Sequence, residues 1–174
     1  MGDTPEQVYV ELADLQAFLR QVEGTISLPP GITLRPVNPA CDEAIIAELY
    51  NAAFREPLEK VTARDVAGYA RHPGLEHEGV FLAFDGPLAV GLVVGRVDVP
   101  APGGAGHRGA VELLAIRPGY RRRGIGRALI IRVFRWLAEH QVRRVGATAE
   151  NPAIVGILES YGFRPAPPPG PQEP

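Results

Sequence analysis

One segment of the sequence has residue types and spacing that indicate binding of a phosphate group. An apolar run, Val111 to Ile116, predicts a strand, and after four residues comes Arg121-Arg122-Arg123-Gly124-Ile125-Gly126-Arg127. Apolar residues at helical spacing then continue to His140. Amides in the first turn of a helix have no intrahelical acceptor, the helix dipole favours negative charge, and glycine lets an anion approach the backbone. The segment therefore predicts a pyrophosphate site at the start of a helix.

Two common phosphate-binding motifs do not fit this segment. A P-loop requires Gly-Lys-Ser or Gly-Lys-Thr, and neither follows the glycines. The dinucleotide fingerprint requires a third glycine where this chain has Leu129. The three arginines before Gly124 add attraction for a phosphate group. A glycine pair that permits tight helix packing, beside a solvated arginine cluster, is the structural alternative.

A second segment, Asn151 to Phe163, lies one predicted strand downstream. The two segments together resemble the GNAT acetyltransferase superfamily. In that family the pattern Arg or Gln, two residues, Gly, one residue, Gly or Ala surrounds the pyrophosphate of acetyl-CoA. Arg121, Gly124 and Gly126 match this pattern.

The resemblance implies acetyl-CoA as the acetyl donor and no metal ion. The family's strand before the glycine pattern pairs its main chain with the pantetheine arm of the cofactor, and Leu114-Ala115-Ile116 occupies that place. The residues that the resemblance and the arginine-glycine segment assign to the cofactor are Leu114, Ala115, Ile116, Arg121, Arg122, Arg123, Gly124, Ile125, Gly126, Arg127 and Asn151.

The sequence departs from the family pattern at two places. The family often has a tyrosine seven residues after the downstream Asn, where it protonates the departing CoA thiolate, and this chain has Leu158 there. Tyr161 is the nearest hydroxyl, and it either acts as the acid instead or packs its ring at the helix end. Family members also usually continue beyond Gly-Phe into a final strand. Here a proline-rich tail follows Phe163, so we expect the last strand to be missing.

The resemblance implies direct attack of an amine on the thioester, without a covalent acyl-enzyme. An amine with a pKa of about 10 is protonated at neutral pH, so a base or a water chain must accept its proton. Glu112 is the first candidate, because it is a carboxylate within an otherwise apolar strand. The alternative for Glu112 is a solvent-facing position paired with an arginine. His107, just before this strand, is a further candidate.

The composition indicates one globular domain in a reducing compartment. The chain has 174 residues, of which 45% are hydrophobic and 22% charged. A net charge of -2 provides no general attraction to nucleic acid or an anionic membrane, and no apolar run approaches the roughly 18 residues that cross a bilayer. Cys41 is the single cysteine, and the start lacks a signal-peptide pattern. We expect a cytoplasmic protein with no nucleic-acid or membrane partner.

Strand and helix patterns follow one another as in an α/β domain. We expect strands near 32–37, 80–84, 88–99, 110–116 and 144–149, and helices near 39–54, 63–71, 124–140 and 152–161. The predicted fold is a mixed, mostly antiparallel sheet flanked by helices, the GNAT-like acyl-CoA-binding fold without its last strand. This domain spans residues 31–164, between an N-terminal helix with a linker (1–30) and a proline-rich tail (165–174).

The N-terminal segment predicts one amphipathic helix from Pro5 to Val22. Its apolar residues recur at helical spacing: Val8, Leu12, Leu15, Leu19 and Val22. Without a last strand, the strand near 144–149 would have one open edge, which invites pairing with another chain. We expect the helix to pack against the core or against a second copy of it, and the protein to be a homodimer. Packing within one chain is the alternative.

The sequence predicts an acetyl-CoA-dependent N-acetyltransferase whose acceptor is an amine of a small molecule or a protein. A catalytically silent acyl-CoA-binding regulatory module is the alternative, because Leu158 removes the usual acid. The motifs do not specify the acceptor. Two acidic residues, Glu76 and Glu78, favour a cationic acceptor if they lie near the thioester.

Overall fold

The computed structural model describes residues 8–54, 60–70, 78–98, 107–149 and 152–168. Its strands are β1 (Val8–Leu12), β2 (Ile32–Pro36), β3 (Glu78–Asp85), β4 (Leu88–Val97), β5 (His107–Ile116), β6 (Val142–Ala149) and β7 (Arg164–Pro165). Its helices are α1 (Leu15–Val22), α2 (Glu43–Ala53), α3 (Ala63–Ala70), α4 (Ile125–Glu139) and α5 (Pro152–Ser160). Within these residues, no helix combines the length and the apolar character needed to cross a membrane.

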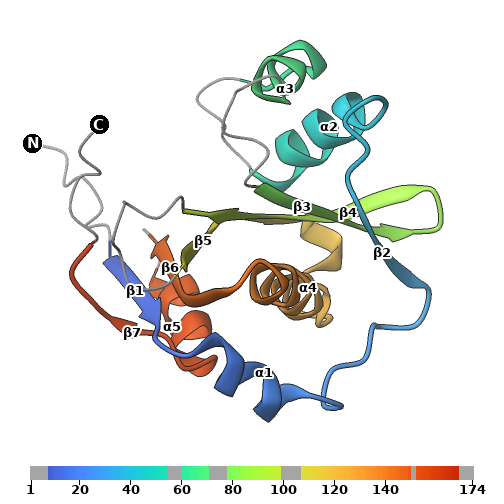
Figure 1. Cartoon of the computed structure of the whole chain (residues 1–174). Coiled ribbons are helices and arrows are strands. Elements are labelled where there is room, and N and C mark those ends of the chain that lie inside the picture. The colour runs from blue at the N-terminus through green and yellow to red at the C-terminus, as the bar shows by residue number, and fades with distance from the viewer. Residues whose placement is uncertain (1–7, 55–59, 71–77, 99–106, 150–151, 169–174) are drawn as a thin grey trace, which may run out of the picture.

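The described strands form one sheet of seven, in the order β2-β3-β4-β5-β6-β1-β7. Every neighbouring pair is antiparallel except β5 and β6, which run parallel. Figure 1 shows α2 and α3 on one face of this sheet, and α1, α4 and α5 on the other. The predicted mixed, mostly antiparallel sheet with flanking helices is confirmed.

Two glycines of β4 let α4 pack directly on the sheet. A Cβ atom at Gly91 would overlap the side chain of Leu129, and one at Gly95 would overlap Val133. Both of these α4 side chains are fully buried. Gly91 also faces Ile125 and Ile116, so the start of α4 is held beside the end of β5.

A buried carboxylate joins β2 to the helix layer on the opposite face. Asp42, with 1% of its side chain exposed, accepts hydrogen bonds from both terminal nitrogens of Arg35, at 2.6 and 2.8 Å, and from the amide of Asn38, at 2.7 Å. Because residues 38–42 form this turn, α2 begins at Glu43 and not directly after Asn38, where the sequence pattern placed its start.

The N-terminal prediction was wrong for residues 8–12, which form strand β1 and not the first turns of a helix. The spacing of Val8 and Leu12 fits a helix, but Val8, Val10 and Leu12 also alternate as in a strand. The free edge of β6 decides between the two, because β1 pairs with it from Val8 opposite Ala149 to Leu12 opposite Val145. The helix begins only at Leu15, after Asp14 accepts a hydrogen bond of 2.9 Å from the amide of Ala17.

The prediction that the tail forms no strand was also wrong. Arg164 and Pro165 form β7, which pairs with β1, and the amide of Ala166 donates to the carbonyl of Tyr9 at 3.1 Å. A proline can occupy this position because β7 lies at the edge of the sheet.

The β6 edge that the sequence left open is therefore paired within the chain, and this removes the reason for expecting a dimer. Helix α1 does not cover that edge. It packs on α4, where the ring of Phe18 meets the ring of Phe134 edge-on at 5.6 Å.

Candidate active site

Strands β5 and β6 pair over the first half of β5 and most of β6. Their parallel register runs from His107 opposite Val142 to Val111 opposite Ala147. Beyond Val111, β5 continues to Ile116 beside β4, and β6 continues to Ala149 beside β1. Within the described residues, the edge of β5 from Glu112 to Ile116 that faces β6 therefore has no strand partner. The run Leu114-Ala115-Ile116 lies on this edge.

A β-bulge in β5 marks the point where the two strands part. Val94 pairs with Leu113, and the next pair is Gly95 with Val111, so Glu112 is the extra residue. Bulges bend a strand and change the direction of its side chains, and they are frequent beside active sites. The Glu112 side chain is 33% exposed, and its Oε1 accepts a hydrogen bond of 2.5 Å from Nε of Arg96. This ion pair agrees with the alternative expected for Glu112, a solvent-facing position paired with an arginine. The carboxylate nevertheless lies at the point where β5 and β6 separate.

The glycine-rich turn presents a row of backbone donors. Arg122 and Gly124 both have a positive φ, 61° and 85°, and α4 begins at Ile125. The first intrahelical hydrogen bond runs from the amide of Ala128 to the carbonyl of Gly124, at 3.1 Å. The amides of Ile125, Gly126 and Arg127 thus have no backbone acceptor in this part of the chain, and the N-terminal cap, a glycine, supplies no side chain. This arrangement fits an anion.

The side chain of Arg121, the first arginine predicted to bind phosphate, donates its hydrogen bonds to backbone carbonyls of the chain itself. Its Nε donates to the carbonyl of Ile116 at 3.1 Å, and its Nη2 donates to the carbonyl of Ala53 at 2.6 Å. Arg117 makes a similar link, to the carbonyl of Ala89 at 3.1 Å and to the Glu48 carboxylate at 2.5 Å. Both arginines fasten the turn to α2 or to β4.

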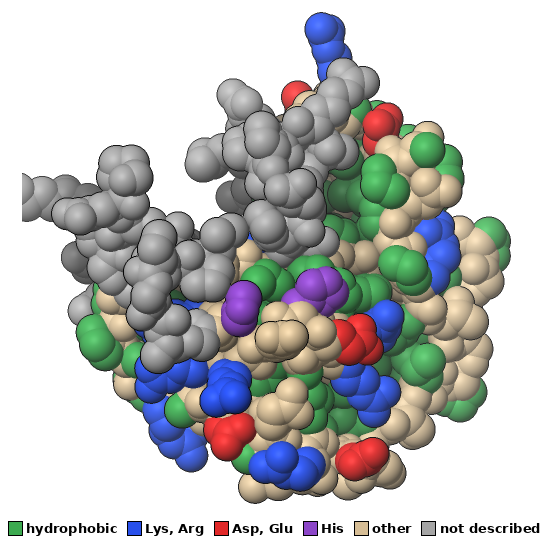
Figure 2. Space-filling view, in the orientation of Figure 1, with side chains coloured by type: hydrophobic (Ala, Val, Ile, Leu, Met, Phe, Trp, Pro, Cys, Tyr) green, Lys and Arg blue, Asp and Glu red, His purple; other side chains and the backbone are tan. Residues whose placement is uncertain are grey.

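The remaining arginines of the turn, Arg122, Arg123 and Arg127, have exposed side chains. The guanidinium of Arg123 lies 5.0 Å from the ring centre of Tyr120. On the face of the molecule shown in Figure 2, acidic side chains lie between the basic ones. The net charge of -2 provides no general attraction for anions, so any attraction of phosphate to Arg122, Arg123 and Arg127 is local.

A polar cluster occupies the α2 side of the sheet around Glu112, and sequence reasoning missed most of it. Asp98, at the end of β4, pairs with Arg96, and burial raises the pKa of its carboxyl, with a further contribution from the charge of Glu112. Burial also raises the pKa of Tyr9, which Arg108 partly opposes. Glu11 pairs with Arg108 and, at 3.4 Å, with Arg144. The members are Tyr9, Glu11, Arg96, Asp98, Arg108, Glu112 and Arg144.

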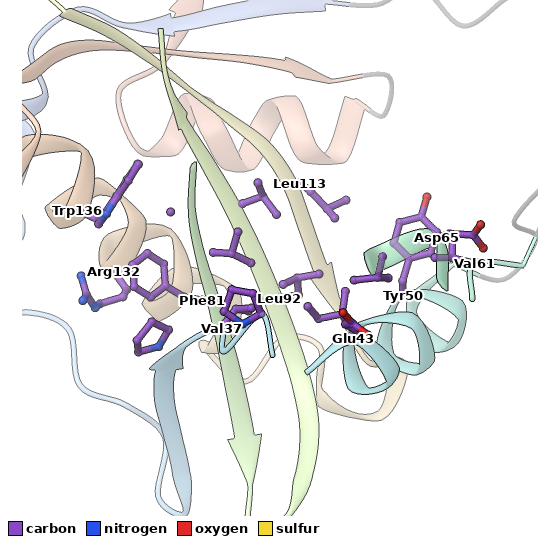
Figure 3. Close-up of a pocket in the computed structure, with 17 residues that line it drawn as sticks. Val37, Glu43, Tyr50, Val61, Asp65, Phe81, Leu92, Leu113, Arg132 and Trp136 are labelled. Atoms are coloured by element: carbon purple, nitrogen blue, oxygen red, sulfur yellow. The ribbon is translucent and has the colours of Figure 1, made fainter. Parts of the chain in front are cut away.

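Beside this cluster lies a pocket of about 630 Å³, lined by the sheet, by helices α2 and α3 on one face and, at the start of β3, by α4 from the other face. Figure 3 shows Tyr50 at the α2 end, Arg132 and Trp136 of α4 at the other end, and Leu92 between them. Most of the lining side chains are apolar: Pro36, Val37, Pro39, Ile46, Val61, Val66, Val80, Phe81, Leu92, Val94 and Leu113.

A family model described as "Acetyltransferase (GNAT) family" matches residues 44–163 of the chain. The chain belongs to this family. The match includes the parted strands, the glycine-rich turn and helix α5. Family membership accounts for the combination of a free β5 edge with free amides at the start of α4.

Two relatives of this GNAT chain are named mycothiol acetyltransferase. The protein of Amycolatopsis mediterranei is 29% identical over 142 residues, which cover 78% of this chain and 47% of the relative. That of Streptomyces avermitilis is 33% identical over 141 residues, which cover 78% of this chain and 44% of the relative. The chain thus spans about half the length of the curated relatives it matches.

A solved structure has a similar fold. It is a tandem GNAT protein from the clavulanic acid biosynthesis pathway, with a TM-score of 0.72 and 17% sequence identity. The alignment covers 94% of this chain and 51% of the other. The likeness supports the GNAT fold.

Leu158 of α5 and Tyr161, directly after this helix, are the residues considered for protonation of the departing thiolate. Leu158, at the position where the family often has tyrosine, is 5% exposed and packs in the core. The half-buried ring of Tyr161 meets Phe18 edge-on at 6.0 Å, and burial raises its pKa, partly opposed by Arg127. Tyr161 thus packs on the α1 and α4 side of the sheet, whereas Glu112 faces the α2 side. The structure does not bring the two predicted catalytic residues together.

Other predicted residues have mixed outcomes. His107 lines a hollow with Gln16 of α1 and Gln141 after α4, so it lies away from Glu112 and is not a nearby base. Asn151 and Glu76 lie outside the described residues, as does the side chain of Glu78. Among the described residues, no three His, Cys, Asp or Glu side chains gather in a group that could hold a metal ion.

Proposed function

We propose that the chain is an acetyl-CoA-dependent N-acetyltransferase that moves the acetyl group to an amine by direct attack. The observation that carries the proposal is the position of the free β5 edge directly beside the free amides of the glycine-rich turn. Leu114 and Ile116 are the side chains nearest to a Cβ placed on Gly126, at 3.6 and 3.8 Å. One extended ligand with an amide-bearing arm and a pyrophosphate can therefore use both features.

In the proposed complex the pyrophosphate accepts hydrogen bonds from the amides of Ile125, Gly126 and Arg127. Arg122 and Arg123 supply positive charge at the outer side of the turn. The main chain of Leu114, Ala115 and Ile116 pairs with the amides of the pantetheine arm. When bound, the donor would supply an activated acyl thioester. An arm that runs along β5 from Ile116 toward Leu114 would direct this thioester toward the bulge at Glu112.

The ammonium group of the acceptor must lose two protons, and the departing thiolate takes up one. Glu112 or a water beside it accepts the first proton, which leaves a neutral amine. The amine attacks the thioester carbon, the new C–N bond forms, the nitrogen loses its second proton to water, and the C–S bond breaks. Leu158 cannot donate a proton to the departing thiolate. A thiolate whose conjugate thiol has a pKa of about 8.5 is, however, a good leaving group without an acid, and it then takes a proton from water. Positioning of the two reactants then lowers the activation barrier by roughly 7–11 kcal/mol and accounts for most of the rate enhancement.

Two measurements test the proposal. Calorimetry with acetyl-CoA should show one binding site per chain, and a free-thiol assay with a panel of primary amines should show CoA release that depends on the amine. Absence of acetyl-CoA binding contradicts the proposed cofactor site.

The buried Leu158 favours one second candidate, a catalytically silent acyl-CoA-binding module. Binding without thiol release for any amine in the panel would support that module over the enzyme.

A further inference from the structure

We infer that the acceptor is a primary amine attached to an apolar group, which the pocket beside α2 binds while Glu112 and Asp98 face the amino group. The inference rests on the proposed function and specifies the chemistry of its acceptor. Two observations support it: the apolar composition of the pocket, and the charged side chains of Glu112, Asp98 and Arg96 at the end of the pocket next to Val94 and Leu113.

The pocket is built to bury apolar surface. Its floor is formed by Leu92 and Val94 of β4 and Leu113 of β5, and α2 contributes Ile46 to the wall. Its volume of about 630 Å³ lies within the range of roughly 300–1,000 Å³ that small-molecule sites have. A ring or a branched alkyl group of an acceptor therefore has space and suitable partners here.

The apolar floor runs directly into the polar cluster. Val94 and Leu113 are opposite each other, and the next side chains on the same face of the two strands are Arg96 and Glu112. Neighbours on one face of a strand lie about 7 Å apart, so an amine on a short linker reaches from the pocket to Glu112. Asp98 adds a second carboxylate, so two carboxylates share the single charge of Arg96, and their remaining acceptor capacity complements an ammonium group.

A polycationic or hydroxyl-rich acceptor fits this pocket poorly. Among the described residues, two carboxylates line the pocket, Glu43 and Asp65, and that of Asp65 already accepts hydrogen bonds from the amide and the hydroxyl of Thr62, at 2.8 and 2.6 Å. The Asp65 carboxylate is therefore engaged in holding the start of α3. Glu43 alone does not match several positive charges. Polar groups that lose water against the apolar floor without new partners are costly to bury.

The chain contains a natural probe of the pocket. Trp136 is its single tryptophan, and it lines the end formed by α4 (Figure 3). Its ring lies against Gly79, where a side chain would overlap it. The ring centre of His140 lies 4.3 Å from that of Trp136, and the two rings are tilted by 37°.

The test is a titration of Trp136 fluorescence, with CoA present, by 2-phenylethylamine and by ethanolamine. The two probes share a primary amine on a two-carbon linker and differ in the apolar ring. We expect 2-phenylethylamine to change the emission with a Kd at least about tenfold lower than that of ethanolamine, the effect of burying two or more methylene equivalents. Equal Kd values for the two amines would overturn the inference.

Two neighbouring residues of α2 provide a matched pair of variants. Ile46 lines the pocket, whereas Ile45 packs against the same core cluster without lining it. Ile46→Gln should raise the Kd of 2-phenylethylamine at least about fivefold and spare acetyl-CoA binding, while Ile45→Gln should leave both constants unchanged. Equal effects of the two variants would contradict the pocket assignment. If Ile46→Gln does not fold, the comparison of the two amines on the natural chain decides alone.

Failure of this inference is distinguishable from failure of the proposed function. Amine binding without thiol release would contradict the enzyme and leave the pocket assignment standing. Thiol release with ethanolamine as efficient as with 2-phenylethylamine would support the enzyme and overturn the apolar acceptor.

Discussion

Nη2 of Arg121 donates a hydrogen bond of 2.6 Å to the carbonyl of Ala53, the last residue of α2. Through Nε the same guanidinium holds the carbonyl of Ile116, the last residue of β5. The glycine-rich turn is thus fastened to α2, which also lines the pocket between this helix and the sheet. The family pattern assigns Arg121 to phosphate binding. In the ligand-free protein its side chain instead holds the turn to α2 and to the end of β5.

Replacing Arg121 separates these two roles. We expect Arg121→Gln to lower the free energy of unfolding of the ligand-free protein by about 1 kcal/mol, or about 2–4 °C in Tm, because the two carbonyls lose a charged donor. Arg122→Gln, an equal loss of charge at an exposed neighbour, should leave Tm unchanged. An unchanged Tm together with weaker acetyl-CoA binding would mean that Arg121 serves the phosphate alone.

Gly126 tests the cofactor site without strain on the fold. A Cβ at this position meets only Leu114 and Ile116 at ordinary contact distances, so Gly126→Val should fold. Its side chain would lie between α4 and the free edge of β5 and weaken acetyl-CoA binding by about ten- to hundredfold, the loss of one charge-assisted hydrogen bond of roughly 1.5–3 kcal/mol. Calorimetry measures the change. Gly156→Val in α5, where a Cβ meets nothing within 4 Å, is the control. Unchanged affinity in folded Gly126→Val protein rules out the site.

Glu112 can be tested as the base because glutamine keeps an acceptor for Arg96. If Glu112 takes the proton, Glu112→Gln should lower kcat by about 100-fold or more and change its pH dependence, while the Kd of acetyl-CoA stays the same. Steady-state kinetics over a range of pH measure this effect, with Glu139→Gln on the exposed end of α4 as control. An unaltered pH profile returns Glu112 to a purely structural partner of Arg96.

Asp42 should make stability depend on pH in the acid range. The hydrogen bonds from Arg35 hold the pKa of its carboxyl below the ordinary value, so its contribution is complete above about pH 4 and is lost as pH falls through the lowered pKa. Asp42→Asn should cost roughly 1.5–3 kcal/mol at pH 7 and progressively less below pH 4. Thermal melts across pH measure the difference. A constant difference at every pH would contradict the role of the ionised carboxylate.

Strand β1 should be essential for stability. Leu12 is 6% exposed, and Leu12→Ala should cost about 2–5 kcal/mol of unfolding free energy. Leu28, at 42% exposure, provides the same substitution at a surface position, where we expect a change within about 0.5 kcal/mol. Denaturant unfolding compares the two. Equal midpoints would show that β1 does not dock as described.

The sequence predicts well those features that depend on neighbours along the chain. The strand at Val111 to Ile116, the turn at Gly124 and the helix after it all follow from local spacing and residue type. The identity of β1 does not, because its residues satisfy both a helical and an alternating pattern. Only the edge of β6, far along the chain, selects the strand. The bulge at Glu112 likewise depends on the register with β4.

The same limit applies to the arginines and the polar cluster. Arg121 finds its partner at the end of α2, a position that no local pattern places near the turn. Tyr9 and Glu11 join the cluster only because β1 is a strand, and Asp98 gains its significance from burial beside Arg96. Each of these relationships depends on contacts between segments distant in sequence.

The placement of β1 between β6 and β7 has a consequence for how the chain acquires its structure. Val8 pairs with Ala149 and Val10 with Pro165, so β1 leaves the ribosome long before its partners β6 and β7 have been synthesised. Pairings between such distant segments are slow to form because a long loop must close first. We expect the corner of the sheet formed by β6, β1 and β7 to be the last part to assemble during synthesis. Until then the edge of β6 is open to other nascent chains, which makes this corner a natural client site for molecular chaperones.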